Sequence, residues 1–219
     1  MDMDTGKTRL LVSVADLARI PYPDQGPSDR HYVNHLSWSP DGTRFLLFNR
    51  WAGKGQPTRV FTMAADGSDL RLLSARNASH WTWRDPEHVL IWAYGAYRLY
   101  KDDGSGEAKE TLWSHPNGHQ SYIPGTTNEW LLTDTYPQGK KREQVLCLYH
   151  IPGKKKIEIG RLRSPSKYRG EWRCDLHPRL SRDGTKVVFD SPHGGNGRQM
   201  YMIDISGIVK PDKTEARTP

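Results

Sequence analysis

Short runs of apolar and aromatic residues alternate with turn residues along most of this chain, a pattern typical of β-strands. The clearest copy contains the turn Ser39-Pro40-Asp41-Gly42, in which proline and glycine occupy favoured positions. Around that turn the pattern predicts strands over 36–39, 44–49, 59–64 and 70–74. This segment therefore indicates a four-stranded antiparallel unit.

The unit recurs along the chain. Further strands are predicted over 89–93, 97–101, 110–113, 130–134, 145–150, 156–161, 186–190 and 199–204. A repeat of about 45 residues with four short strands has the size of a propeller blade. We therefore predict an all-β fold: a single β-propeller domain over 1–219, with about four four-stranded antiparallel blades over 30–75, 76–114, 115–163 and 174–206.

The last repeat is one strand short, and residues 8–14 have the pattern of an outer strand of a preceding or closing blade. Two interpretations stay open. The segment completes the last blade and closes a ring of four, or the chain is part of a longer, seven-bladed propeller, which typical blade numbers favour. Two insertions, over 18–30 and 164–173, interrupt the period.

Four histidines occupy the same position in successive repeats. They are His35, His80, His119 and His177, each followed three positions later by a bulky residue. Repeats arranged radially would bring the four imidazoles towards one axis. Imidazole is the commonest protein metal ligand and the usual general base near neutral pH. The alternative is that shared ancestry alone preserved a histidine that caps a strand.

A carboxylate accompanies the last of these histidines. Asp175 lies two residues before His177, so the two side chains share one face if the segment is extended. We therefore treat His80, His119, Asp175 and His177 as candidate ligands of a divalent metal. Imidazole combined with carboxylate suits manganese, iron or zinc.

Three arginines, Arg50, Arg173 and Arg198, flank strand ends. A guanidinium binds carboxylates through paired hydrogen bonds, so these residues are candidates for binding an anionic substrate. The alternative is that each is an ordinary surface arginine. Arg173 is the strongest of the three because it is close to Asp175.

Composition narrows the class of molecule that this protein is expected to bind. The 219 residues carry a net charge of +7, part of it in Lys140-Lys141-Arg142 and Lys154-Lys155-Lys156, which we expect to be hairpin tips. This charge favours an acidic oligosaccharide over nucleic acid, because no nucleic-acid-binding motif accompanies it. The acidic start and the short apolar run over 10–14 predict neither a signal peptide nor a membrane span, so we expect a cytoplasmic protein. A Gly-x-Ser-x-Gly elbow, a phosphate-binding glycine loop and paired zinc cysteines are absent from the sequence.

Two resemblances extend this interpretation. Ser39-Pro40-Asp41-Gly42 followed by a β-run resembles the TolB-like propeller repeat. The order Asn34-His35, Ser79-His80, Gly118-His119 and then His177-Pro178 before a Ser-x-Asp-Gly turn resembles the C-terminal blades of oligogalacturonate lyases. Those enzymes are seven-bladed, manganese-dependent polysaccharide lyases. The resemblance covers roughly residues 30–206.

The resemblance to these lyases implies roles for individual residues. His35 matches the catalytic base, His80 and His177 match metal ligands, and manganese is the implied metal. Asp175 stands where the family has the first histidine of a His-x-His pair. The family's glutamine ligand falls near Trp172 and is not matched, and its catalytic arginine has no clear counterpart. The implied reaction is β-elimination, in which a base removes the C5 proton of a uronate and the 4-linked sugar leaves.

Three hypotheses follow. The first is a lyase-like propeller with a metal at the axis that acts on, or binds, acidic oligosaccharides such as oligogalacturonate. The second is a non-catalytic TolB-like propeller that binds protein or carbohydrate. The third is an inactive fragment of the first.

Overall fold

The structure is a computed structural model that describes residues 4–22, 30–52, 57–74 and 77–209. Contacts group the chain into two compact units. Unit 1 comprises Met1–Ser79, Asp85–Tyr94 and Arg98–Glu110, and unit 2 comprises His80–Arg84, Gly95–Tyr97 and Thr111–Pro219. Each unit is described separately below, and the single domain expected over 1–219 stays a prediction.

The first sheet belongs to unit 1. Its order is β1-β2-β3-β4, with strands β1 (His31–Trp38), β2 (Arg44–Trp51), β3 (Thr58–Ala64) and β4 (Arg71–Ser74). Strand β1 begins at His31 and not at residue 36 as predicted. The reason is a register shift between Asn34 and Ser37, which lets residues on both sides of the irregularity pair with β2.

The second sheet has the order β5-β6-β7-β8. Its strands are β5 (Ala78–Asp85), β6 (His88–Ala93), β7 (Ala96–Lys101) and β8 (Ala108–Ser114). Strands β6 and β7 are joined by a two-residue turn, a length typical of a β-hairpin.

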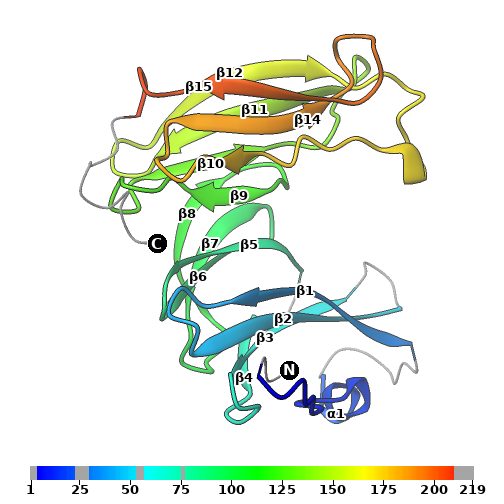
Figure 1. Cartoon of the computed structure of the whole chain (residues 1–219), viewed down its shortest axis with the longest axis vertical. Coiled ribbons are helices and arrows are strands. Elements are labelled where there is room, and N and C mark those ends of the chain that lie inside the picture. The colour runs from blue at the N-terminus through cyan, green and yellow to red at the C-terminus, as the bar shows by residue number, and fades with distance from the viewer. Residues whose placement is uncertain (1–3, 23–29, 53–56, 75–76, 210–219) are drawn as a thin grey trace. The chain divides into compact units, whose positions relative to one another are not determined.

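Two further sheets lie in unit 2 (Figure 1). One has the order β12-β11-β10-β9 and the other the order β13-β14-β15. Their strands are β9 (Gln120–Tyr122), β10 (Trp130–Asp134), β11 (Glu143–His150), β12 (Lys155–Arg163), β13 (Arg179–Leu180), β14 (Lys186–Ser191) and β15 (Gln199–Asp204). A 3₁₀ turn, η1 (Gly170–Trp172), precedes β13. Leu132, Leu146, Leu176 and Phe189 belong to one buried core shared by these two sheets.

The described residues therefore form four antiparallel sheets, three with four strands and one with three, each in sequence order. This confirms the predicted fold class, an all-β chain built of β-propeller blades. The last sheet has three strands among the described residues, one fewer than the others, as predicted. Among the described residues, no helix is long and apolar enough to cross a membrane.

The prediction of an outer strand over residues 8–14 was wrong. The described part of this segment forms no strand, and helix α1 (Val14–Arg19) begins at its last residue. Ser13 and Asp16 form a capping box: the Ser13 side chain accepts from the Asp16 amide, and the Asp16 carboxylate accepts from the Ser13 amide. These local hydrogen bonds satisfy the first amides of a helix and so start one where the apolar pattern indicated a strand. Of the insertion expected over 18–30, residues 23–29 lie outside the described part of the chain.

Helix α1 packs on the first sheet. Leu17 is fully buried with Leu47 and Phe61. The guanidinium of buried Arg59 donates to the backbone oxygens of Leu17 and Ile20, at 2.9 and 2.8 Å. These bonds satisfy carbonyls at the end of the helix and hold it on the sheet.

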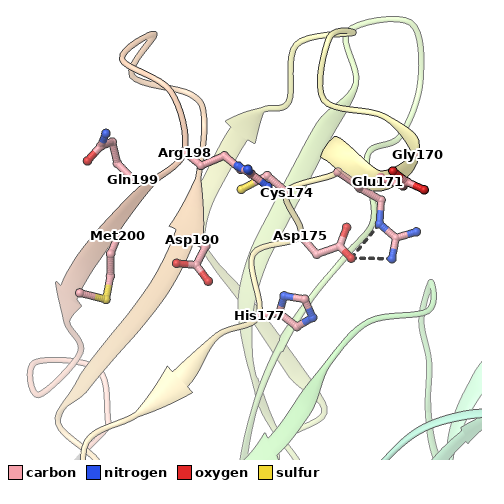
Figure 2. Close-up of a pocket in the computed structure, with 10 residues that line it drawn as sticks. Gly170, Glu171, Cys174, Asp175, His177, Asp190, Arg198, Gln199 and Met200 are labelled. Atoms are coloured by element: carbon pink, nitrogen blue, oxygen red, sulfur yellow. Dashed lines mark hydrogen bonds and ion pairs between the residues drawn. The ribbon is translucent and has the colours of Figure 1, made fainter. Parts of the chain in front are cut away.

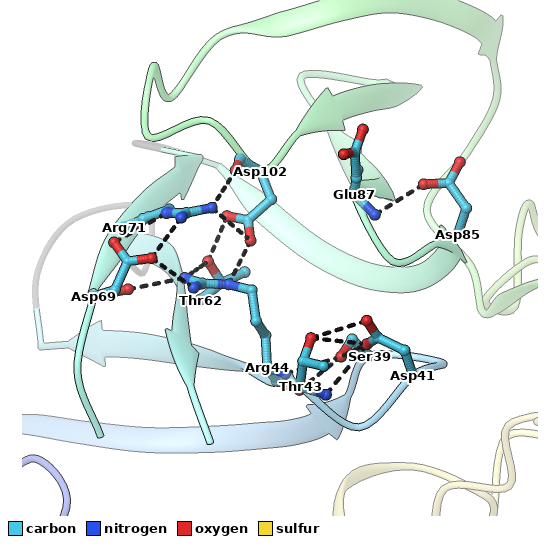
Figure 3. A network of polar contacts seen from close by, with 10 residues as sticks. All are labelled: Ser39, Asp41, Thr43, Arg44, Thr62, Asp69, Arg71, Asp85, Glu87 and Asp102. Atoms are coloured by element: carbon cyan, nitrogen blue, oxygen red, sulfur yellow. Dashed lines mark hydrogen bonds and ion pairs between the residues drawn. The ribbon is translucent and has the colours of Figure 1, made fainter. Parts of the chain in front are cut away.

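Inside unit 1, the buried carboxylate of Asp102 links the end of β7 to strands of the first sheet (Figure 3). Asp102, directly after β7, accepts a hydrogen bond from the Thr62 hydroxyl at 2.5 Å and pairs with Arg44 Nε at 2.7 Å. Arg71 donates to its backbone oxygen at 2.8 Å. The charge of this aspartate, whose side chain is 2% exposed, is thus compensated by partners on β2, β3 and β4.

Candidate metal centre

Two of the four repeat histidines have the same local backbone. His35 and His177 both adopt positive φ, 56° and 42°, and each stands four residues before the serine of a Ser-x-Asp-Gly turn. The two turns share their hydrogen bonds. The serine hydroxyl donates to the aspartate at 2.6 Å (Ser39) and 2.5 Å (Ser181), and the serine amide donates to the residue five positions on, at 2.9 and 3.0 Å. The repeat register predicted from sequence is therefore present in the backbone at these two positions.

His119 is held by a carboxylate. Because Thr133 pairs with Gln120 across β9 and β10, Asp134 comes opposite His119. The His119 amide donates to Asp134 Oδ1 at 2.6 Å, and its Nδ1 lies 3.0 Å from both carboxylate oxygens. A carboxylate only accepts hydrogen bonds, so in the neutral ring Nδ1 carries the hydrogen and Nε2 has the lone pair. Such carboxylate–histidine pairs orient the imidazoles that bind metals.

Gly118 makes this approach possible. A Cβ at this position would lie 1.9 Å from the backbone oxygen of Asp134, which is far inside van der Waals contact. A side chain there would push β9 away from β10 and separate His119 from its carboxylate. The glycine before His119 is thus required by close backbone approach.

Asp175 and His177 complete a group with His119. One ligand atom from each of the three lies within 4.8 Å of the others, and the His119 and His177 rings are 4.1 Å apart between centroids. Asp175 and His177 extend from the segment before β13 (Figure 2). Partial desolvation, and then the neighbouring His119, lower the pKa of His177, which favours the neutral imidazole that can bind a metal.

One oxygen of Asp175 lacks a partner. Arg173 donates to Oδ2 through Nε at 2.9 Å and forms an ion pair through Nη2 at 2.8 Å. Oδ1 is buried and has no hydrogen-bond partner among the described residues. Because the residue is only 6% exposed, an unmatched carboxylate oxygen there is costly. A cation between this oxygen and the two imidazoles would remove that cost.

His80 lies beside this group without belonging to it. Its ring centroid is 4.3 Å from that of His119. Its Nδ1 is 2.9 Å from the Asn117 side-chain oxygen, and its Nε2 is 3.3 Å from the Tyr136 hydroxyl. Both ring nitrogens therefore have hydrogen-bonding neighbours, and His80 would have to give up one of them to bind a metal. Its predicted role as a ligand stays a prediction.

Asp175 and His177 face a cleft of about 790 Å³ in unit 2 (Figure 2). Asp175 and His177 line it together with Arg173 and Arg198, two of the three arginines selected from the sequence. Arg173 lies over the Tyr136 ring at 5.0 Å and Arg198 over the exposed Trp172 ring at 5.7 Å. The cleft therefore combines potential metal ligands with two guanidinium groups.

The other two selected residues, His35 and Arg50, belong to unit 1. The His35 ring packs edge-on against Phe48, with centroids 5.4 Å apart, and Arg50 lies over the same Phe48 ring at 5.5 Å. Neither residue is part of the group formed by His119, Asp175 and His177. Their predicted roles, catalytic base and substrate binding, stay predictions.

Sequence reasoning missed Asp134, Asn117 and Tyr136, which contact the repeat histidines. A usable signal existed for Asp134: it ends the strand that follows His119, and in an antiparallel pair that end faces the start of the previous strand. Asn117 and Tyr136 lie outside the strands, where no periodicity marks them.

The donor set fits a divalent metal. Two imidazoles and one carboxylate suit manganese, iron or zinc, and the unpartnered oxygen of Asp175 points to a missing positive partner. The fold and this site together define a class: a β-propeller with a candidate metal centre in one unit.

Comparison of the sequence with known protein families and with curated proteins gave no match. Comparison with solved structures did. An oligogalacturonate lyase in complex with manganese has a TM-score of 0.56 at 12% identity, covering 82% of this chain and 52% of that one. An oligogalacturonate lyase from Vibrio parahaemolyticus has a TM-score of 0.59 at 13% identity, covering 80% and 49%. TolB from Acinetobacter baumannii has a TM-score of 0.53 at 16% identity, covering 78% and 40%.

These similarities establish the propeller fold. This chain spans about half the length of the two lyases and less of TolB. The resemblance to lyase and TolB propellers predicted from sequence motifs is therefore confirmed as a similarity of structure.

Proposed function

We propose that this chain is part of a lyase-like β-propeller that binds a divalent metal and an acidic oligosaccharide and carries out β-elimination on it. The observation that carries the proposal is the group of His119, Asp175 and His177, with one buried oxygen of Asp175 unpartnered, beside a cleft that also contains Arg173 and Arg198. The structural similarity to a manganese-bound oligogalacturonate lyase supports uronates as the substrate class and manganese as the metal.

His119, Asp175 and His177 would hold the metal, with His80 beside them as a further candidate ligand. A bound divalent cation would supply Lewis acidity towards the carboxylate of a uronate, which acidifies the proton at C5. Asp134 occupies the Nδ1 side of His119, which leaves Nε2 as the nitrogen that would bind the cation. Arg173 fixes Asp175 through Oδ2, so that Oδ1 remains for the cation.

The remaining polar groups suit an acidic chain of sugars. Arg198 lines the cleft as a donor for a uronate carboxylate, and the Trp172 ring beneath its guanidinium, 67% exposed, offers an apolar face for a sugar. In the proposed reaction a base takes the proton from C5, a double bond forms between C4 and C5, and the C4–O bond breaks. The departing oxygen receives a proton, so no water is consumed. His35 is the base that the sequence resemblance implies.

The test combines metal content with elimination. We expect purified protein to bind manganese at about one ion per chain, and His119→Ala to lower the manganese affinity by about 100-fold or more, since loss of an outer-shell partner alone costs 10–100-fold. His150→Ala removes a half-buried imidazole of the same unit that lies outside the group, and should leave affinity unchanged. His35→Ala should retain the metal and lose roughly 100- to 10,000-fold of the elimination rate, the usual contribution of a general base. The rate is followed by the ultraviolet absorbance of the unsaturated product from oligogalacturonate.

Metal binding without elimination of oligogalacturonate or other uronides would overturn the lyase proposal. It would favour the second candidate, a non-catalytic propeller that binds carbohydrate or protein. The similarity to TolB at a comparable TM-score supports that candidate. Equal manganese affinities in His119→Ala and the unsubstituted protein would remove the metal centre from either function.

A further inference from the structure

A second pocket, of about 330 Å³, lies entirely within unit 1. It is formed where strands end and turns begin. Its lining includes Arg50 at the end of β2, Asn77 and Ser79 at the start of the second sheet, and Trp92 and Tyr94 at the end of β6. A volume near the lower end of the roughly 300–1,000 Å³ typical of ligand pockets suits a single sugar ring rather than a chain of sugars.

Tyr94 has an unusual backbone for a tyrosine. With Gly95 it makes the two-residue turn between β6 and β7, and both have positive φ, 52° and 77°. Positive φ at both central positions is the mark of a type I′ turn, which favours asparagine, aspartate or glycine at the first of them. An aromatic side chain in this conformation is strained.

Packing in the core does not explain why a tyrosine occupies this turn position. Its side chain lies at the surface, and the residue is 52% exposed. The Arg98 guanidinium lies over the ring at 5.7 Å, while its Nε donates to the backbone oxygen of Ala93 at 3.1 Å. An exposed aromatic residue kept in a strained turn at the edge of a pocket suggests a binding role.

Arg50 supplies charge to the same pocket. Its Nε is buried and has no hydrogen-bond partner among the described residues. Its guanidinium lies over the Phe48 ring at 5.5 Å, and its backbone pairs with Thr58, which also lines the pocket. A guanidinium that lines a pocket and is held on an aromatic face is suited to bind a carboxylate through paired hydrogen bonds.

We infer that this pocket binds one uronate ring, with a sugar face packed on Tyr94 and the carboxylate on Arg50. The C–H groups of one pyranose face carry a slight positive charge and pack against the negative face of an aromatic ring. The choice of a uronate over another anionic sugar rests on the proposed function. The pocket itself does not, because all the residues that line it belong to unit 1, whereas the candidate metal centre belongs to unit 2.

The test uses the full chain after removal of divalent metals with a chelator, so that the metal centre does not contribute. Calorimetric titration with D-galacturonate is compared with D-galactose, which lacks the carboxylate, and with galactose 1-phosphate. We expect galacturonate to bind about tenfold or more tightly than galactose, and Arg50→Gln to remove that difference.

Tyr94→Asn separates binding from folding. Asparagine suits the turn better than tyrosine, so we expect the thermal midpoint to stay unchanged or rise while galacturonate affinity falls about tenfold. A lower midpoint with unchanged affinity would show that Tyr94 is structural and overturn the inference. Tighter binding of galactose 1-phosphate than of galacturonate would overturn the uronate assignment.

The two proposals fail in different ways. If galacturonate binding is lost in His177→Ala and kept in Arg50→Gln, the pocket in unit 1 is not a sugar site and the inference is overturned, while the proposed function stands. If binding depends on Arg50 and Tyr94 and elimination of oligogalacturonate is absent, the pocket is supported and the lyase proposal falls.

Discussion

Two aspartates, one in each unit, are buried to nearly the same extent and have very different surroundings. The side chain of Asp102 is 2% exposed and that of Asp175 is 5% exposed. Asp102 accepts a hydrogen bond from the Thr62 hydroxyl on Oδ1, and its Oδ2 forms ion pairs with Arg44 and Arg71, so its partners come from three strands (Figure 3). Asp175 receives Arg173 on one oxygen, and its other oxygen has no hydrogen-bond partner in the described part of the chain (Figure 2).

The difference shows how burial of one residue type can serve stability or binding. A buried charge that is fully compensated holds strands together, and removal of one partner is strongly destabilising. A buried charge that is half compensated weakens the ligand-free protein and is available to a cation. The substitutions below test this contrast in order of decreasing expected effect.

Asp102→Asn should have the largest effect on folding. The amide keeps the shape of the carboxylate, but it removes the buried charge that pairs with Arg44 Nε, and Asp69, whose side chain is 46% exposed, remains as the other ion-pair partner of Arg44. Loss of one partner of a buried ion pair costs about 3–5 kcal/mol, and because Asp69 still pairs with Arg44 we expect the lower end, about 3 kcal/mol. Chemical denaturation measures the change in the free energy of unfolding. Manganese affinity of the folded fraction should remain unchanged, and a stability loss well below 1 kcal/mol would contradict the assigned role.

Asp175→Asn should have a large effect on metal affinity and a small effect on folding, the reverse of Asp102→Asn. Manganese affinity should fall by about 100-fold, because a ligand with a negative charge is lost. The unfolding free energy of the metal-free protein should change little, since Arg173, whose side chain is 52% exposed, is the one ionic partner of Asp175 among the described residues. A loss of metal-free stability as large as that of Asp102→Asn would show that Asp175 is structural.

The two Ser-x-Asp-Gly turns should show the smallest effect, through pH. Hydrogen bonds from Ser181 and Thr185 lower the pKa of Asp183 to about 2, and those from Ser39 and Thr43 lower the pKa of Asp41. A lowered pKa in the folded state stabilises the protein above the unfolded pKa of about 3.9, and this stabilisation is lost as pH falls through the folded pKa. Asp183→Ala should therefore be less stable than the unsubstituted protein at pH 6, and the difference should shrink between pH 4 and pH 2.

Thermal unfolding of Asp41→Ala over the same pH range is the matched measurement in unit 1. Its turn has the same hydrogen bonds, so the difference should shrink in the same direction. A difference that stays constant or grows towards pH 2 in both variants would mean that these carboxylates do not stabilise the turns through their charge.

The fold was largely predictable from the sequence, because period-two alternation and Ser-x-Asp-Gly turns are local signals that survive in each repeat. Strands such as β10 and β15 were predicted with their bounds as observed. The segment over 8–14 was mispredicted for an equally local reason, since the capping box of Ser13 and Asp16 outweighs a short apolar pattern.

The candidate site was predictable only in part. Repeat position alone identified His119 and His177, and spacing alone identified Asp175 as a neighbour of His177. Repeat position also identified His80, whose nitrogens the tertiary structure directs to Asn117 and Tyr136. Position in a repeat determines where a side chain begins, and neighbours from other strands decide which of its atoms remain available.

The sequence by itself determined most of the strands, the Ser-x-Asp-Gly turns and the register of His35 and His177, because these depend on hydrogen bonds and alternation within a few residues. Tertiary structure alone decided that Asp134 orients His119, that Asp175 keeps one oxygen unpartnered, and that Arg50 and Tyr94 share a pocket. Those relations join residues from different strands, and the free energy of a buried charge depends on every neighbour that surrounds it.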